Sequence, residues 1–151
     1  DRERRYDGWS GLLLAPISRT SLFLGKAGSL AVLIVVTEAA LVPLTAMLFG
    51  VPLADHLVEL SALLVAGAVG FALVSTLLGA IALRARTGEL LLGAVLSPLV
   101  VPILIGGVKG TMVLLGDGSF AELRPWLGLV LLADALYLVA GLWLFESLTT
   151  E

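Results

Sequence analysis

The sequence has no cysteine and only one histidine, and both scarcities exclude chemistry. Without cysteine the chain cannot form disulfides, thiolate metal sites or cysteine nucleophiles. The nucleotide-binding signature GxxxxGK[ST] is absent too, because the segment LFLGKAGS lacks both the first glycine and the Ser or Thr that must follow the lysine. We therefore expect neither a catalytic nor a metal site, and expect that any ATP is hydrolysed by another chain.

Charge is also scarce. Charged residues make up 14 % of the chain and hydrophobic residues 59 %, with a mean hydropathy of +1.08, far from the composition of a soluble domain. The sequence has no basic stripe with interleaved aromatic residues, so we expect no nucleic-acid partner. The composition predicts an integral membrane protein in a lipid bilayer.

Four apolar runs are long enough to cross a hydrocarbon core of about 30 Å: residues 27–49, 60–83, 90–108 and 126–145. The third run contains Pro98 and Pro102 and is closed by Gly106 and Gly107. Because proline removes a helical hydrogen bond, we expect this span to be discontinuous near the prolines, either kinked or re-entrant. Residues 109–125 are expected to stay on the outer side as short helices that do not cross.

Basic residues are distributed unevenly between the two sides that four alternating spans define. Seven of the nine fall on the side of the N-terminus: Arg2, Arg4, Arg5, Arg19, Lys26, Arg84 and Arg86. Lys and Arg near span ends are retained in the cytoplasm, so both ends of the chain are expected there, with the spans in the cell inner membrane. Trp126, Tyr137 and Trp143 lie towards the ends of the last run, as interfacial aromatic residues would.

Residues 1–26 form a charged and then amphipathic lead-in to the first span. Its apolar side chains recur at helical spacing: Trp9, Leu12, Leu13 and Ile17, with Leu14 as a further candidate. This spacing predicts a short helix lying along the membrane surface. The helix could either anchor and orient the next span or dock onto a soluble partner. A chain that opens with charges just ahead of a span is typical of a segment cut from a longer protein.

Few polar residues could act inside the membrane or beside it. Glu38 and Asp134 are the acids within spans, where each could form a polar contact in a transport pathway, pair with another helix, or only fix packing as a protonated or hydrogen-bonded group. We expect Glu38 to face the bundle interior or a subunit interface. His56, Met47 and Met112 could ligate haem or a metal, or could be ordinary loop and packing residues.

Residues 12–26, LLLAPISRTSLFLGK, carry a family resemblance. The segment resembles the CcmB family, the membrane-spanning permease of the cytochrome c maturation haem exporter. Pro16, Arg19, Gly25 and Lys26 stand where that family has a proline, a polar pair and a Gly-Lys step before a span. The likeness continues through three further stretches and the glycine-rich second span: residues 41–51, 82–87 and 91–105. It covers the last four of the six spans in family members.

The resemblance implies an ABC-2-like permease fragment with an all-α fold. We expect one domain over residues 1–151, a polytopic transmembrane helical bundle of four spans with an N-terminal cytoplasmic interfacial helix, lacking about two N-terminal spans. Residues 1–26 would form the cytoplasmic coupling element and the entry to the first span. The implied ATPase-coupling residues are Trp9, Leu12, Leu13, Pro16, Ile17, Arg19 and Lys26.

The family also implies partners and an activity. The permease would work with a cytoplasmic ABC ATPase subunit, with haem-handling membrane subunits and with a haem chaperone. Haem would be a transported or handled ligand and not a directly bound cofactor, and ATP hydrolysis would drive haem export or release of the haem-loaded chaperone. The alternatives are a permease for polysaccharide or lipid, and a non-transporting membrane assembly scaffold.

Overall fold

The computed structural model describes residues 18–84 and 89–147. Within these ranges the chain forms four long helices and one short 3-10 helix, and no strand. The elements are α2 (Arg19–Phe49), η2 (Ala54–His56), α3 (Leu57–Arg84), α4 (Glu89–Leu115) and α5 (Phe120–Ser147). All four long helices are long and apolar enough to cross a membrane. The predicted all-α bundle with four spans is therefore confirmed.

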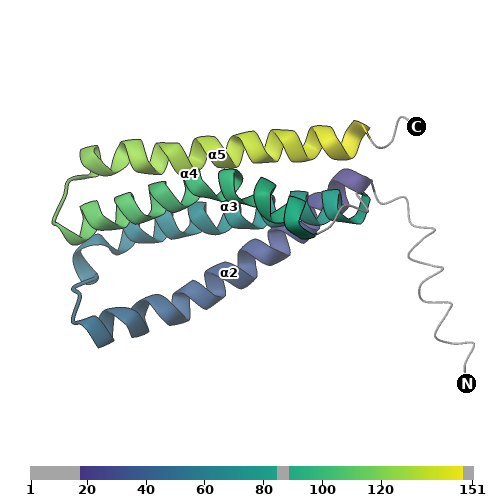
Figure 1. The fold of residues 1–151 in the computed structure, drawn as a ribbon. Coiled ribbons are helices and arrows are strands. Elements are labelled where there is room, and N and C mark those ends of the chain that lie inside the picture. The colour runs from purple at the N-terminus through teal and green to yellow at the C-terminus, as the bar shows by residue number, and fades with distance from the viewer. Residues whose placement is uncertain (1–17, 85–88, 148–151) are drawn as a thin grey trace, which may run out of the picture.

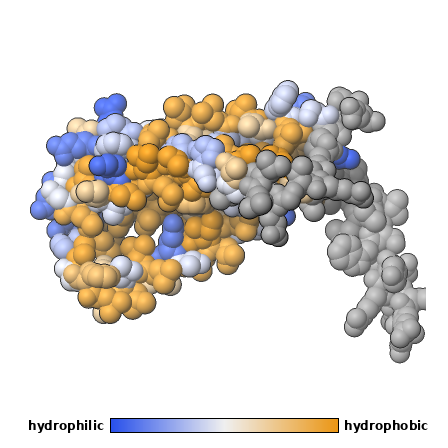
Figure 2. All heavy atoms as spheres, in the orientation of Figure 1, coloured by the Kyte–Doolittle hydropathy of each residue, from blue (hydrophilic) through white to orange (hydrophobic). Residues whose placement is uncertain are grey.

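The four helices alternate in direction (Figure 1). The connections at residues 50–56 and 116–119 lie together at one end, called here the loop end. The start of α2 and the end of α5 lie together at the opposite, terminal end. Figure 2 shows hydrophobic side chains over the middle of the visible face and hydrophilic ones gathered at the loop end, the pattern of a bundle whose middle lies in lipid.

Helix α2 is packed less completely than the others. It lies against the bundle at the terminal end and diverges from it towards the loop end (Figure 1). None of its most apolar stretch is buried, whereas 44 % of the corresponding stretch of α3 is. With 31 residues α2 is about 46 Å long, more than the hydrocarbon core is thick, so in a membrane it tilts or extends beyond the core.

Two apolar clusters hold the helices together. The cluster towards the terminal end buries Phe23 and Ala27 of α2 against α3, α4 and α5. The cluster towards the loop end is built by α3, α4 and α5 around buried residues such as Leu63 and Leu123, and α2 adds only the partly buried Val42 to it. Helix α2 is thus fixed to the bundle near its start and only loosely attached near its end.

Glycines set the closest helix contacts. A Cβ added at Gly106 of α4 would lie 2.9 Å from the Trp126 carbonyl oxygen of α5, and one at Gly141 of α5 would collide with the Phe23 ring. In membranes, small residues at such crossings allow backbones to pack closely, which stabilises helix pairs where the hydrophobic effect does not. These glycines therefore position α5 against both α4 and α2.

Helix α4 corrects the prediction for the third span. It runs without interruption through Pro98 and Pro102, and it continues to Leu115, so the expected break and the re-entrant alternative are wrong, while the kinked alternative stays a prediction. Residues 109–115 are its last two turns and not a separate short helix, while the outer-side location of this end stays a prediction. The prolines are tolerated because neighbouring helices can satisfy backbone groups that a proline frees.

Helix α5 begins before the predicted span and uses one aromatic residue differently. It starts at Phe120, six residues ahead of Trp126. Tyr137 was expected among the interfacial aromatic residues, but it is only 8 % exposed and its hydroxyl donates a hydrogen bond to the carbonyl oxygen of Leu99. This oxygen lies between the two prolines of α4, where a partner from α5 steadies the helix.

Candidate functional site

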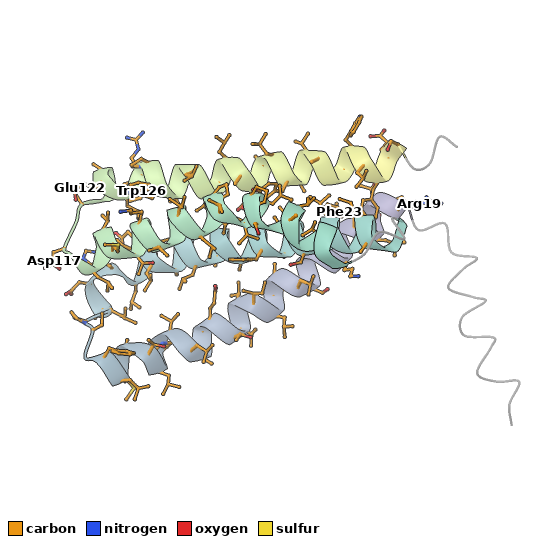
Figure 3. All side chains as sticks on the ribbon, viewed as in Figure 1. Arg19, Phe23, Asp117, Glu122 and Trp126 are labelled. Atoms are coloured by element: carbon orange, nitrogen blue, oxygen red, sulfur yellow. The ribbon has the colours of Figure 1, made fainter. Side chains whose placement is uncertain are left out.

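The predicted coupling residues lie at the terminal end or outside the described ranges. Five of them precede the described residues: Trp9, Leu12, Leu13, Pro16 and Ile17. Arg19 and Lys26 occupy the first turns of α2, next to Phe23 (Figure 3). Ser18 precedes α2 as a regular N-cap, and its side chain accepts a hydrogen bond from the backbone N–H of Ser21 at 3.2 Å. A displacement of the lead-in would therefore be transmitted to the bundle through the capped first turn of α2.

Phe23 connects this helix start to the far end of the chain. Its side chain is 1 % exposed and lies under Gly141, and its ring centroid is 4.9 Å from that of Phe145. The first and last described helices therefore meet directly at the terminal end. The aromatic contact fixes the angle at which α2 leaves the bundle.

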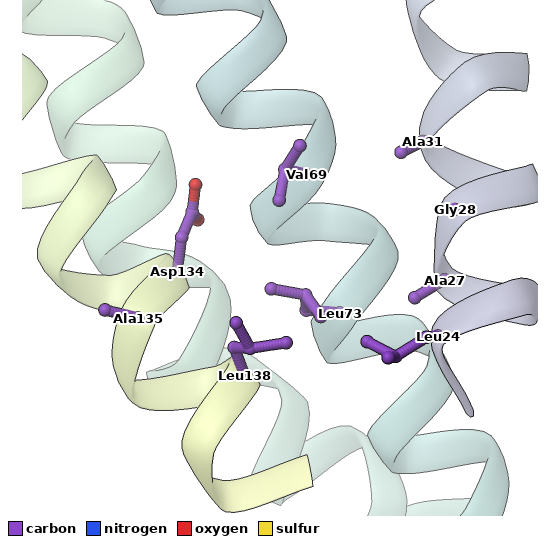
Figure 4. A pocket seen from close by; sticks show the side chains of 9 residues that line it. All are labelled: Leu24, Ala27, Gly28, Ala31, Val69, Leu73, Asp134, Ala135 and Leu138. Atoms are coloured by element: carbon purple, nitrogen blue, oxygen red, sulfur yellow. The ribbon is translucent and has the colours of Figure 1, made fainter. Parts of the chain in front are cut away.

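Asp134 lies in the middle of α5, close to α3. It is 8 % exposed, and among the described residues no donor reaches its Oδ1. The carboxyl group packs over Gly70 of α3, at a point where any added Cβ would collide with it. It also borders a hollow of about 290 Å³ between α2, α3 and α5, which is otherwise lined by apolar residues and Gly28 (Figure 4).

Glu38 lies in the middle of α2 and faces α3 and α4. It borders two hollows, one of about 190 Å³ between α2 and α3 and one of about 200 Å³ that reaches α4. Its Oε2 atom is buried, and the described part of the chain supplies no hydrogen bond to it. Asp134 borders a separate hollow, so the structure does not bring the two acids together.

The hydroxyl groups within the spans behave differently from the acids. Thr37, Thr45, Thr76 and Thr111 each donate to the carbonyl oxygen four residues earlier in their own helix, at 2.7 to 2.8 Å. A hydroxyl bonded in this way leaves no unsatisfied donor in lipid. The two carboxyl groups are thus the polar groups in the described spans that stand out as unpaired.

His56 lies at the loop end and joins the two connections there. Its Nε2 is 3.8 Å from Oδ1 of Asp117, a contact that becomes an ion pair when the histidine is protonated. Met47 and Met112 are 83 % and 60 % exposed on the outside of the bundle, so they do not converge with His56 on a ligand. Within residues 18–84 and 89–147, no group of three or more His, Asp or Glu side chains could hold a metal ion.

Comparison with known protein families identifies the family of this chain. Residues 5–144 match the family model described as CcmB protein, so the match covers α2 to α4, all but the last three residues of α5, and most of the lead-in. The chain belongs to the CcmB family. A search of curated proteins and a search of solved structures each found no match.

Membership in the CcmB family gives the chain a class of function. Members are membrane permease subunits of a haem-exporting ABC transporter for cytochrome c biogenesis, and such subunits are generally non-catalytic. The chain is accordingly a multi-pass membrane protein that works within a complex of several subunits.

Sequence reasoning did not find the contact of Tyr137 with α4, or the role of Gly70 beneath Asp134. Gly70 is one of several small residues at three- and four-residue spacing in its span, a signal for close helix approach but not for one particular partner. Tyr137 carries no sequence signal that separates a buried donor from an interfacial ring.

Proposed function

We propose that this chain is the permease through which a cytoplasmic ABC ATPase drives haem export or the release of a haem-loaded chaperone. The observation that carries the proposal is the CcmB family match over residues 5–144, because it includes both the bundle and the lead-in. The sequence supports the division of labour, since it has no nucleotide-binding signature of its own.

The first 18 residues of the lead-in are the proposed contact with the ATPase. They carry apolar residues at helical spacing beside basic ones, which suits a helix at the cytoplasmic surface of the inner membrane. Arg19 and Lys26 follow on the first turns of α2. A displacement of α2 would be transmitted to α5 through the contact between Phe23 of α2 and Gly141 of α5.

Haem enters the proposal as a handled ligand. The remaining partners are haem-handling membrane subunits and a membrane-anchored haem chaperone. The chain itself is not proposed to hold haem as a resident cofactor.

Complementation tests the function. The complete gene is expressed in cells that lack their own CcmB family member, and c-type cytochromes are measured by haem staining after electrophoresis. We expect cytochromes to return, and to be lost again when the ATPase partner carries an inactive nucleotide site. Normal cytochrome formation without an active ATPase would contradict the proposal.

A second experiment tests the contact with the ATPase. Replacing Leu12, Leu13 and Ile17 together with Ser should abolish copurification of the ATPase while membrane insertion stays normal, because the spans are unchanged. The matched control replaces both leucines with Ile and Ile17 with Leu, which keeps the apolar surface and should keep the partner. Equal recovery of the ATPase with both variants would contradict a contact through this face.

A further inference from the structure

We propose that the face of α2 around Glu38 is a docking site for a further transmembrane helix, one outside α2 to α5, which donates a hydrogen bond to the Glu38 carboxyl group. The site, called here the Glu38 groove, consists of the two hollows that Glu38 borders. This inference concerns a neighbour within the membrane. It does not depend on which molecule the complex handles.

The shape of the bundle leaves room for such a helix. Helix α2 diverges from α3 towards the loop end (Figure 1). The Glu38 groove accordingly continues into a third hollow of about 490 Å³ that reaches Phe49. Val42 and Leu60 border both this hollow and the groove, so the space is continuous along α2. Figure 2 shows the recess on the surface of the molecule.

The donors that border the Glu38 groove are already used. Ser61 donates to the Val58 carbonyl oxygen at 2.8 Å, and Thr111 donates to the Gly107 carbonyl oxygen at 2.7 Å. A hydroxyl group has one hydrogen to donate, so neither can also satisfy Glu38. The other residues that border the two hollows are apolar or glycine. Within the described helices, therefore, no side chain that borders the groove donates a hydrogen bond to Glu38.

The glycines of the groove differ from those at the filled crossings. A Cβ added at Gly67 of α3 or Gly107 of α4 would meet nothing within 4 Å, whereas one at Gly70, Gly106 or Gly110 would collide with a neighbouring helix. Small residues at a helix surface allow another backbone to approach closely. Gly67 and Gly107 thus present a helix-packing surface that no described helix covers.

The unpaired carboxyl group favours a helix over lipid as the occupant. Acyl chains can fill an apolar hollow but carry no donor, and a polar group in hydrocarbon is usually paired with protein. A transmembrane helix satisfies its own backbone and can place one donor side chain at the depth of Glu38. The predicted partner segment therefore carries a Lys, Arg, Asn, Gln, Ser, Thr or Tyr near its middle.

Photo-cross-linking in the intact complex tests the proposal. A photo-reactive residue is placed at Val42, which borders the groove, or at Val36, a control on α2 that is 62 % exposed and lies outside these hollows. We expect Val42 to give a discrete adduct whose cross-linked peptide, identified by mass spectrometry, is a transmembrane segment outside α2 to α5 with a donor near its middle. We expect no such adduct from Val36.

Substitutions of Glu38 test the hydrogen bond. Glu38→Leu should lower the yield of the Val42 adduct at least tenfold, and Glu38→Gln, which still accepts a hydrogen bond, should keep most of it. Should Glu38→Leu reduce the amount of folded protein, Gly107→Leu provides the same test by filling the groove without changing the acid. Its control is Gly79→Leu, which adds the same side chain at a glycine with no neighbour within 4 Å and outside these hollows.

Four results would overturn the inference: adducts to lipid alone, adducts to α2 to α5 of a second copy, an adduct to a segment without a donor, or an adduct that survives both Glu38→Leu and Gly107→Leu. Copurification of the ATPase, measured on the same samples, distinguishes a failure of this inference from a failure of the proposed function. A groove without a helix leaves that copurification unchanged.

Discussion

Gly106 and Gly107 are adjacent in α4 but differ in what surrounds them. An added methyl group at Gly106 would press against the Trp126 carbonyl oxygen and Val130, while one at Gly107 would enter open space. Gly106→Ala should lower the free energy of unfolding by about 1–3 kcal/mol, the usual cost of overpacking. Gly107→Ala should leave it unchanged or raise it by up to about 1 kcal/mol, since alanine favours helix. Unfolding in mixed detergent micelles measures both, and equal effects would contradict the close crossing of α4 and α5 at Gly106.

Tyr137 stabilises α4 through one hydrogen bond to Leu99. Tyr137→Phe keeps the ring but removes the donor, so it should lower the free energy of unfolding by about 0.6 kcal/mol and at most about 1.7 kcal/mol, the range measured for hydrogen bonds between membrane helices. Thr37→Val is the control, because Thr37 donates only within its own helix at 2.8 Å and should change stability little. A Tyr137→Phe variant as stable as the parent would show that the bond does not hold the helices together.

The sequence was least informative about the neighbours of individual side chains. It identified Glu38 and Asp134 as buried-acid candidates because a charge within an apolar run is visible without a structure. Which neighbours they face depends on how α2 leans and how α5 is rotated, and neither follows from hydropathy. Tyr137 shows the same limit, because its acceptor is a backbone oxygen thirty-eight residues earlier in the chain.

At the scale of elements, the end of α4 can be tested directly. Met112 lies in its last turns, and the structure makes this segment part of one continuous helix where the sequence predicted separate short helices. Met112→Pro should lower the free energy of unfolding by about 3 kcal/mol, because proline removes a backbone hydrogen bond and clashes with the preceding turn.

Met112→Ala is the matched control for this substitution. The Met112 side chain is 60 % exposed, so truncation should cost little, and circular dichroism with unfolding in detergent compares the two variants. A Met112→Pro variant as stable as Met112→Ala would contradict a continuous helix through Met112.

The reason for the error in α4 is specific. Gly106, Gly107 and Lys109 lower the apparent hydropathy of the run and suggest its end, but both glycines lie within α4, Gly106 at its contact with α5, and Lys109 is exposed close to the loop end. A lysine near a span end can extend its ammonium group to the interface, so it need not end the helix. The other three runs have no such cluster, and the sequence located each of them within a longer helix.

At the scale of the whole molecule, the arrangement predicts which end faces the cytoplasm. Basic residues concentrate at the terminal end, so the loop end should face outwards. Since the chain has no cysteine, single cysteines can be placed at Asp117 and Glu122 of the loop end and at Ser147 of the terminal end. In intact cells a membrane-impermeant thiol reagent should label the first two, and should label the third only after permeabilisation. The opposite pattern would invert the topology.

The number of spans and their alternation were predictable because both depend on composition over many residues. Segments longer than the hydrocarbon core stand out in any apolar sequence, and an even number places both ends on one side. The lean of α2 was not predictable, because it depends on tertiary contacts. Phe23 packs into the cluster at the terminal end, whereas α2 contributes only the partly buried Val42 to the cluster at the loop end.

That lean makes α2 a rod pinned near one end. Phe23 holds it against Gly141, and from there the helix extends through Phe49, a length of about 39 Å at 1.5 Å per residue. Only about 6 Å of helix precedes the pin, so the two arms differ in length about sixfold. A rotation of about 5° around Phe23 would carry the far end through more than about 3 Å, while Arg19 moved by roughly half an ångström. Geometry alone would thus magnify a slight motion at the start of α2 into a substantial one across the membrane.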